Sequence, residues 1–368
     1  MTISPFKLER YFAKYEFSVK YLLSASDCDG LNQSQLLSLA NKSSKKLWDN
    51  LSLGYTESTG SSLLRKEITK LYKGINPEQI LVAAPEEGIY IAMNTILRKG
   101  DHIIVTFPGY QSLYEIAKSL GCEVTCWEPE EDKNWFFNPE FLEKNIRKNT
   151  KMIVVNFPHN PTGFLPSVSD FKKITDTAKK HGVYLFSDEM YRFLEYETKD
   201  RLPSAVEIYD KAIILFGMSK TFGLPGLRIG WLITKDKKLL NEFAAFKDYT
   251  TICSSAPSEM LAIIALQNKD TIIKPILKRI ERNLKYLDKF LLKHADKFSW
   301  VRPRSGTIGL IRLNSHQSSD QFCKEIVDKF GIMLLPSTVY EFGNSHFRIG
   351  FGRENFPEAL DKLNLVLS

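Results

Sequence analysis

The stretch Gly217-Met-Ser-Lys-Thr-Phe-Gly-Leu-Pro-Gly-Leu-Arg-Ile-Gly230 places Lys220 in a glycine-rich turn between the apolar runs 213–216 and 229–234. Short apolar runs bounded by such a turn predict buried strands, so the lysine amine would be partly withdrawn from water. Desolvation lowers the pKa of an amine and makes it a nucleophile toward carbonyl groups. An aldehyde cofactor with a phosphate group would need such a lysine and a nearby cation, which Arg228 offers. The alternative is a hairpin turn with a solvated lysine.

The composition is that of a globular protein of 368 residues, with 43% apolar and 25% charged residues, and the length allows two domains. The net charge of +7 is spread without a long basic block, so we expect no nucleic-acid partner. No apolar run is long enough to span a membrane and the N-terminus lacks a signal-like stretch. The five cysteines are scattered, which favours core thiols over disulfides or a metal site and predicts a cytoplasmic protein.

Strands and helices alternate along the middle of the chain. The expected strands are 80–83, 102–106, 151–156, 183–187 and 212–216, and the expected helices between them are 85–97, 113–120 and 169–181. This alternation predicts an α/β fold with a mostly parallel sheet that has helices on its faces. Ligands of such sheets bind outside the carboxyl ends of the strands.

Chemically distinctive side chains follow these strand ends: Glu86 and Glu87, Tyr110, Asn160, Asp188 with Tyr191, and Lys220. Each has an ordinary explanation, such as a turn, a helix cap or loop packing. Their gathering at one edge of the sheet favours a common site instead.

One cofactor matches this set of groups, an aldehyde on a pyridine ring. The aldehyde would react with Lys220, and an anion such as Asp188 would keep the ring nitrogen protonated. Tyr110 is a candidate for stacking on the ring, while Asn160 and Tyr191 are candidates to bind its hydroxyl group.

The phosphate of such a cofactor would need a helix N-terminus and a cation. The backbone amides of Glu86 and Glu87 open an expected helix, and Arg228 carries a fixed positive charge.

The chain resembles the class I/II aminotransferases, which are fold-type I pyridoxal-phosphate enzymes of the aspartate aminotransferase kind. The matching stretches, in order, are Tyr55 with Gly60-x-x-x-Leu64-Arg65, Pro108-Gly-Tyr110, Asn160-Pro-Thr-Gly163, Ser187-Asp-Glu-x-Tyr191, Ser219-Lys220 with Gly226-x-Arg228-x-Gly230, and Phe347-Arg348-Ile-Gly350. They extend from about residue 20 to the C-terminus, and the ordered set is far more specific than any one motif.

The resemblance implies a role for each matching residue. Lys220 would be the Schiff-base lysine and the base of the proton shift, with Asp188 and Tyr191 completing the catalytic set. The implied cofactor-binding residues are Lys220, Asp188, Asn160, Tyr191, Tyr110, Arg228, Ser219, Glu86, Glu87 and Tyr55. Tyr55 would reach the phosphate of a neighbouring subunit, which implies a homodimer with shared active sites. Arg348, with Asn160, would bind the α-carboxylate of the substrate.

Three departures from the family pattern concern mainly the phosphate. Ala84-Pro85 stands where glycine or serine is usual, and Pro85 has no amide hydrogen to donate. Gly217 stands where serine is common, and 335–337 reads Leu-Pro-Ser where Pro-Gly is usual. Phosphate binding would then depend more on Arg228, Ser219, Tyr55 and the helix N-terminus.

A long helix over about 271–294 follows the sheet, with apolar residues at spacings of three and four. A shorter α+β section comes after it. We expect a three-layer cofactor domain at 45–270 and a smaller α+β domain made of 1–44 and 271–368, which would close on the substrate by a hinge motion.

The predicted activity is transfer of an amino group from an L-amino acid to a 2-oxo acid, with pyridoxal 5′-phosphate as cofactor and no metal. An alternative is a lyase, cyclase or oxidase that uses the same cofactor. The acidic stretches Glu86-Glu87 and Ser26-Asp-Cys-Asp29 would favour a basic amino acid if they lie at the pocket mouth. A more remote alternative is a non-catalytic ligand-binding protein of the same fold.

Overall fold

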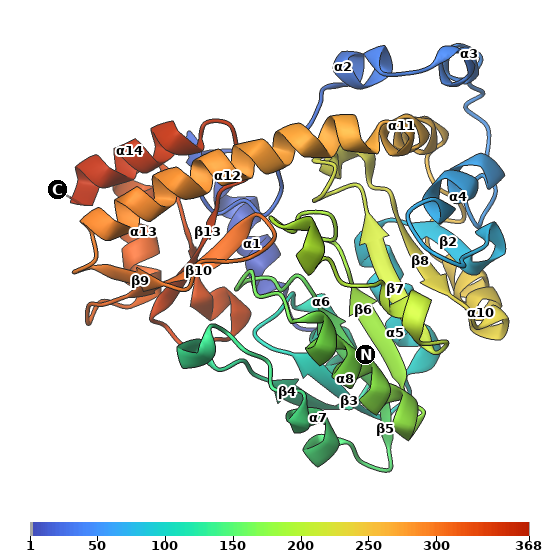
Figure 1. The fold of residues 1–368 in the computed structure, drawn as a ribbon, viewed down its shortest axis with the longest axis horizontal. Helices are drawn as coiled ribbons and strands as arrows, with labels where there is room; N and C mark the ends of the chain where they lie inside the picture. The colour runs from blue at the N-terminus through green and yellow to red at the C-terminus, as the bar shows by residue number, and fades with distance from the viewer. Residues whose placement is uncertain (1–2, 368) are drawn as a thin grey trace.

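The computed structural model describes residues 3–367 and is built around a seven-stranded sheet in the order β2-β8-β7-β6-β5-β3-β4 (Figure 1). Its strands are β2 (Ile80–Ala83), β3 (His102–Thr106), β4 (Glu123–Trp127), β5 (Thr150–Asn156), β6 (Tyr184–Asp188), β7 (Ala212–Gly217) and β8 (Gly230–Thr234). All neighbouring pairs are parallel except those made by β8, which is antiparallel to both β2 and β7. The predicted mostly parallel α/β fold is thus confirmed.

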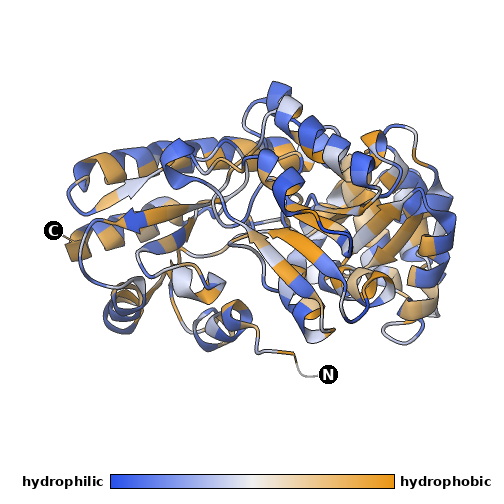
Figure 2. Ribbon diagram, turned by 90° about the horizontal axis from the view of Figure 1, so that it is seen from below, coloured by the Kyte–Doolittle hydropathy of each residue, from blue (hydrophilic) through white to orange (hydrophobic). Residues whose placement is uncertain are grey.

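The sheet is covered on its faces because its central strands are apolar throughout. Every residue of β2, β3, β7 and β8 is buried, as expected for strands enclosed on both sides. The helices of this half are α4 (Ser62–Thr69), α5 (Pro85–Ile96), α6 (Ser112–Ser119), α7 (Glu140–Asn145), α8 (Val168–His181), α9 (Ala205–Ile208), α10 (Lys237–Lys247) and α11 (Ala256–Gln267). Figure 2 shows the apolar residues concentrated on the strands and the polar ones on the outer faces of the helices.

A second, smaller sheet lies beyond the first, in the order β12-β13-β10-β9. Its strands are β9 (Phe298–Trp300), β10 (Ile308–Leu313), β12 (Leu335–Pro336) and β13 (His346–Gly350), and the helices beside it are α13 (Ser319–Phe330) and α14 (Phe356–Leu367). The 25-residue helix α12 (Lys269–Lys293) runs along the molecule from α11 to this sheet (Figure 1).

The N-terminal segment joins both halves. Its short strand β1 (Tyr21–Leu22) pairs in parallel with β11 (Ile332–Met333). The helix α1 (Lys7–Tyr15) packs beside the short helix 337–340, whereas α2 (Gln33–Ser38) and α3 (Lys42–Asp49) lie against α11. Among residues 3–367, no helix is both long and apolar enough to cross a membrane.

Candidate active site

A cavity of about 390 Å³ opens at the carboxyl ends of the parallel strands, between the two sheets. Its walls include these predicted residues: Glu86, Tyr110, Asn160, Asp188, Tyr191, Ser219, Lys220, Arg228 and Arg348. The fold therefore gathers at one place side chains that are up to 262 residues apart in sequence, from Glu86 to Arg348. Glu87 and Tyr55 are the two predicted residues that do not line it.

Lys220 follows β7 in a turn, and its Nζ donates a hydrogen bond to Ser26 Oγ at 2.8 Å. Burial lowers the pKa of this amine below its usual value, an effect that Asp27 partly opposes. The amine is thus held inside the cavity. The turn does join an antiparallel pair, β7 and β8, but the alternative of a solvated lysine in it is wrong.

Asp188 ends β6 and is only 5% exposed. Its Oδ1 accepts a hydrogen bond from the backbone N–H of Met190 at 3.0 Å. Burial raises the pKa of this carboxyl to about 7, although the Met190 hydrogen bond and Lys220 act the other way. A buried carboxyl in this state gains stability when a cation is placed beside it, because the cation favours the ionised form.

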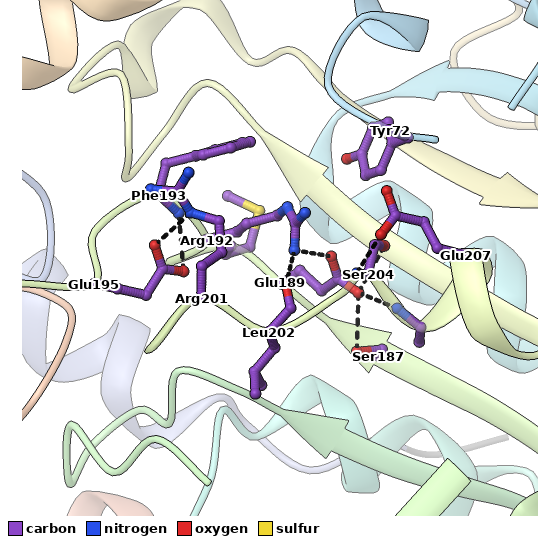
Figure 3. A network of polar contacts seen from close by, with 12 residues as sticks. Tyr72, Ser187, Glu189, Arg192, Phe193, Glu195, Arg201, Leu202, Ser204 and Glu207 are labelled. Carbon is purple, nitrogen blue, oxygen red and sulfur yellow. Dashed lines mark hydrogen bonds and ion pairs between the residues drawn. The ribbon is translucent and has the colours of Figure 1, made fainter. Parts of the chain in front are cut away.

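A buried polar network holds the segment that follows Asp188 (Figure 3). Glu189 accepts hydrogen bonds from Ser204 Oγ and the backbone N–H of Ala205, both at 2.9 Å, and lies 3.9 Å from Arg192. Thr221, the residue after the lysine, donates from its Oγ1 to the backbone oxygen of Arg192 at 2.6 Å. The turn that carries Asp188 and Tyr191 is thereby tied to the lysine turn.

Arg348 projects from β13 and is only 1% exposed. Its guanidinium donates to the Ser24 backbone oxygen at 2.6 Å, to Asn160 Oδ1 at 3.3 Å and to the Tyr340 hydroxyl. No carboxylate of residues 3–367 forms an ion pair with it. A buried guanidinium with only neutral partners is costly unless an anion binds there.

Tyr110 lines the cavity with its ring against Phe6, at a centroid distance of 4.9 Å. Its hydroxyl donates to Glu9 at 3.0 Å. Burial, followed by the charges of Glu86 and Glu9, raises its pKa well above the usual value, so the ring stays a neutral phenol.

Ser219 and Arg228 lie where a phosphate would need donors. The Ser219 hydroxyl is buried and has no hydrogen-bond partner within the described chain. The Arg228 guanidinium donates to the backbone oxygen of Pro225 at 3.1 Å and is otherwise open to solvent and the cavity. Both groups keep the capacity to bind an anion.

Helix α5 begins at the same place, and its two glutamates differ. The Glu86 side chain lines the cavity, where burial raises its pKa to about 7 against the hydrogen bond from Ser112. The Glu87 carboxylate turns away and accepts hydrogen bonds from the hydroxyls of Thr250 and Thr251. Only the backbone of Glu87 remains as the predicted contact.

The departures at Pro85 and Gly217 are one packing feature. A Cβ built on Gly217 would lie 2.8 Å from Gly230 Cα, 2.9 Å from the Ile229 oxygen and 3.2 Å from Pro85 Cγ. A Cβ on Gly230 would lie 2.9 Å from the same proline ring. The backbone of the partner strand thus leaves no room for a serine at 217, and Pro85 packs beside the two glycines.

Tyr55 does not line the cavity and lies on the surface, where it is 90% exposed. It cannot serve the site of its own subunit in this conformation. Its predicted role requires a second subunit.

Sequence reasoning missed one wall of the cavity, which α1 supplies. Leu8, Glu9, Phe12 and Glu16 line the cavity from this N-terminal segment. Glu9, Phe12 and Glu16 follow at spacings of three and four residues, which places them on one helical face, and this is the signal that would have found them. Ser26 and Asp27 also line the cavity, as expected if the acidic stretch lies at its mouth, whereas Asp29 does not.

These residues fit pyridoxal phosphate. The cavity holds a desolvated amine at Lys220, a buried carboxyl at Asp188 and an unpartnered hydroxyl at Ser219. The amine can react with the aldehyde, the carboxyl can pair with the ring nitrogen, and the hydroxyl can donate to the phosphate.

The sequence model of the aminotransferase class I and II family matches residues 18–363. The chain belongs to this family. A solved pyridoxal-phosphate-dependent aminotransferase from Streptococcus suis 89-1591 is 30% identical and superposes with a TM-score of 0.93, covering 100% of this chain and 98% of that one.

Curated relatives of this aminotransferase cover most of its length. The aspartate aminotransferase of Pyrococcus horikoshii is 26% identical over 331 residues, which is 85% of this chain and 83% of the relative. The capreomycidine synthase of Streptomyces vinaceus is 27% identical over 268 residues, 72% of this chain and 67% of the relative. The chain is a pyridoxal-phosphate-dependent transaminase, as the sequence predicted.

Proposed function

We propose that this aminotransferase moves the amino group of an L-amino acid to a 2-oxo acid with Lys220, Asp188 and Arg348 as its central residues. The observation that carries the proposal is their convergence in one cavity from β7, β6 and β13. These are an amine, a buried acid and a buried guanidinium without an anionic partner. They match the needs of an aldehyde, a pyridine nitrogen and a substrate carboxylate.

Pyridoxal phosphate, when bound, supplies the electron-withdrawing ring that makes the Cα proton of an amino acid acidic. Lys220 Nζ would hold the cofactor and then move the proton, since its lowered pKa leaves a larger neutral fraction. Asp188 would hold the proton on the ring nitrogen, while Tyr110 supports the ring face. Asn160 and Tyr191 would bind the ring hydroxyl.

Arg348 would orient the substrate through its α-carboxylate. Its guanidinium is fixed by Ser24, Tyr340 and Asn160 before any substrate arrives, so little freedom is lost on binding. The phosphate would bind Ser219, Arg228 and the backbone at the start of α5.

We also propose a homodimer in which Tyr55 completes the phosphate site of the partner. Leu53, Tyr55, Tyr249 and Ile252 are exposed by 82%, 90%, 92% and 52%. Their two segments adjoin, because Thr56 Oγ1 donates to the Ser254 oxygen at 2.9 Å. An exposed apolar patch of this kind supports an interface between subunits.

The division into a cofactor domain at 45–270 and a small domain of 1–44 with 271–368 is likewise a proposal. Each sheet lies within one of these parts, and β1 pairs with β11 inside the small one. Closure of the small domain would carry Arg348 toward Lys220 and exclude water.

The test is the absorbance of the purified enzyme with pyridoxal phosphate, before and after each amino acid of a broad panel is added. We expect a visible band that disappears as the cofactor is aminated and an equimolar 2-oxo acid in the product. The proposal fails if Lys220→Ala retains both. Mixing Tyr55→Phe with Lys220→Ala tests the dimer, because hybrid dimers would regain one intact site.

A second function, cyclisation of an amino acid, is favoured by the similarity to capreomycidine synthase. Product mass separates the two. A 2-oxo acid indicates transamination, whereas a cyclic product keeps the amino nitrogen.

A further inference from the structure

The cavity has an end that the cofactor and the substrate carboxylate leave unexplained. We call Glu9, Glu16 and Asp27 the acidic wall, since all three line the cavity beside the lysine. Glu9 and Glu16 come from the α1 segment, and Asp27 from the segment that also places Ser26 on Lys220 Nζ.

The α1 segment turns two carboxylates toward the cavity together with apolar residues. A helix that covers a core normally turns its apolar residues inward and its charges outward. Here two of the inward residues, at a spacing of seven, are glutamates, and Leu8 and Phe12 lie between or beside them. Carboxylates placed inward need a cation or hydrogen-bond donors to remain ionised.

The protein itself supplies few such partners to the acidic wall. Glu9 accepts one hydrogen bond, from the Tyr110 hydroxyl, and no side chain of residues 3–367 donates to the Glu16 carboxylate. Burial, followed by the charge of Asp27, raises the pKa of Glu16, with Arg353 and Lys220 opposing. Of the three carboxylates of the wall, Asp27 alone forms an ion pair within residues 3–367, with Arg353.

Arg353 offsets only part of this charge. It donates to Asp27 at 3.0 and 3.2 Å and to Asp29 at 3.4 Å, so one guanidinium already serves two carboxylates. The cations that line the cavity are Lys220, Arg228 and Arg348, and each has a task at the cofactor or the α-carboxylate. None of the three forms an ion pair with Glu16.

The position of Asp27 in the wall is fixed by close backbone packing. A Cβ built on Gly350 would lie 1.7 Å from the Ala25 oxygen, and one on Gly30 would lie 1.8 Å from the Gly223 oxygen. The segment 25–30 is thus held tightly between β13, which carries Arg348, and the turn that carries Lys220. Asp27 is thereby placed at a set position relative to both groups.

Resting on the proposed function, we propose that the acidic wall binds the side chain of the amino donor, and that this side chain is cationic, a guanidinium or an ammonium group. Glu16 carries the largest part of this recognition, because Glu9 and Asp27 already have partners. A dicarboxylic substrate would place its side-chain carboxylate against that of Glu16. An aromatic substrate would bury Glu16 without supplying a cation for it.

The experiment measures single-turnover amination of the cofactor in the holoenzyme with arginine, ornithine, lysine, aspartate, phenylalanine and citrulline. Citrulline has the shape of arginine without its charge. We compare the rate constants per donor concentration. At least one of the three cationic donors should exceed aspartate, phenylalanine and citrulline by roughly 10-fold or more, with arginine well above citrulline. The comparison of arginine with ornithine and lysine decides between guanidinium and ammonium.

Variants at Glu16 separate charge recognition from a structural role. Glu16→Gln should raise the apparent dissociation constant of the cationic donor by roughly 10- to 100-fold and change citrulline by less than about twofold. Glu16→Lys should improve aspartate relative to the wild type. Glu140→Gln, the same change at an exposed position on α7, should alter neither.

Each outcome decides the matter. If aspartate or phenylalanine aminates the cofactor faster than every cationic donor, or if Glu16→Gln affects citrulline as much as arginine, the substrate inference is overturned while the transaminase stands. If no amino acid changes the absorbance of the loaded enzyme, the proposed function itself fails.

Discussion

The two ends of the cavity are built in different ways. The cofactor end collects Asp188, Lys220 and Ser219 from consecutive strand ends of one parallel sheet. The acidic wall comes instead from the N-terminal segment, from α1 and the loop that carries Asp27. The difference teaches that the sheet sets the chemistry, which all donors share, while the added segment sets which donor is accepted.

Removing the lysine should have the largest effect and should not discriminate between donors. Lys220→Ala is expected to lower single-turnover amination by about 10²- to 10⁴-fold or more for every amino acid, because the proton-moving amine is lost. Lys237→Ala, at an exposed position, is the control. A loss confined to basic donors would contradict the division between the two ends.

Arg348→Lys should give the next largest effect. It keeps the positive charge but removes the planar, forked donor, so the donor concentration at half-maximal rate should rise by roughly 10- to 100-fold for all donors. The maximal rate should change little, and thermal unfolding should verify that the fold is retained. Arg302→Lys, at a partly exposed ion pair with Asp288, serves as the matched control.

Glu86 gives a pH-dependent prediction at the phosphate. Its pKa of about 7 lies above the ordinary value, so the carboxyl is neutral below pH 7 and becomes an anion beside the phosphate above it. Cofactor affinity should therefore fall as pH rises through about 7. In Glu86→Gln the decrease in affinity over this range should be smaller by a factor of roughly three to ten. Fluorescence titration with pyridoxal phosphate at pH 6 and pH 8.5 measures it.

The same raised pKa has a consequence for folding. The folded state binds the Glu86 proton more tightly than the unfolded state, so this group destabilises the apoprotein progressively between about pH 4.5 and 7 as pH rises. Glu86→Gln should gain relative stability over that range in denaturant titrations. An unchanged difference across the range would contradict the assignment.

Glu9→Gln should have the smallest effect and should resemble Glu16→Gln in kind. Because the Tyr110 hydroxyl already shares Glu9, we expect only about a twofold to fivefold weakening, restricted to cationic donors. Apparent dissociation constants for arginine and citrulline in this variant measure it. Equal weakening of both would indicate that Glu9 acts through Tyr110 rather than through charge.

The sequence predicted the strands of the large sheet closely because they are fully buried apolar runs. The ranges 80–83 and 102–106 agree with β2 and β3 residue by residue. Strand β4 was not predicted, since at the sheet edge Glu123, Val124 and Thr125 are partly exposed and mix polar with apolar types. The antiparallel direction of β8 was contained only in the hairpin alternative, because direction depends on how the lysine turn folds back.

The site was predictable where a residue follows its own strand, as Asp188 and Lys220 do. The sequence could not show that the Glu87 side chain turns away from the site. It does so because Thr250 and Thr251 donate to its carboxylate, and their positions depend on tertiary packing. The α1 wall escaped because its helix lies more than 170 residues from the active-site strand ends of β6 and β7, although the spacing of Glu9, Phe12 and Glu16 was visible.

The close approach of Gly217 to its partner strand limits what position 217 can hold. A side chain there would meet the Gly230 Cα at 2.8 Å and the Ile229 oxygen at 2.9 Å, and both are backbone atoms of the neighbouring chain segment. Replacing Pro85 by a smaller residue would therefore not make room for a serine at 217. The pairing of β7 with β8 itself excludes a hydroxyl from this side of the lysine turn.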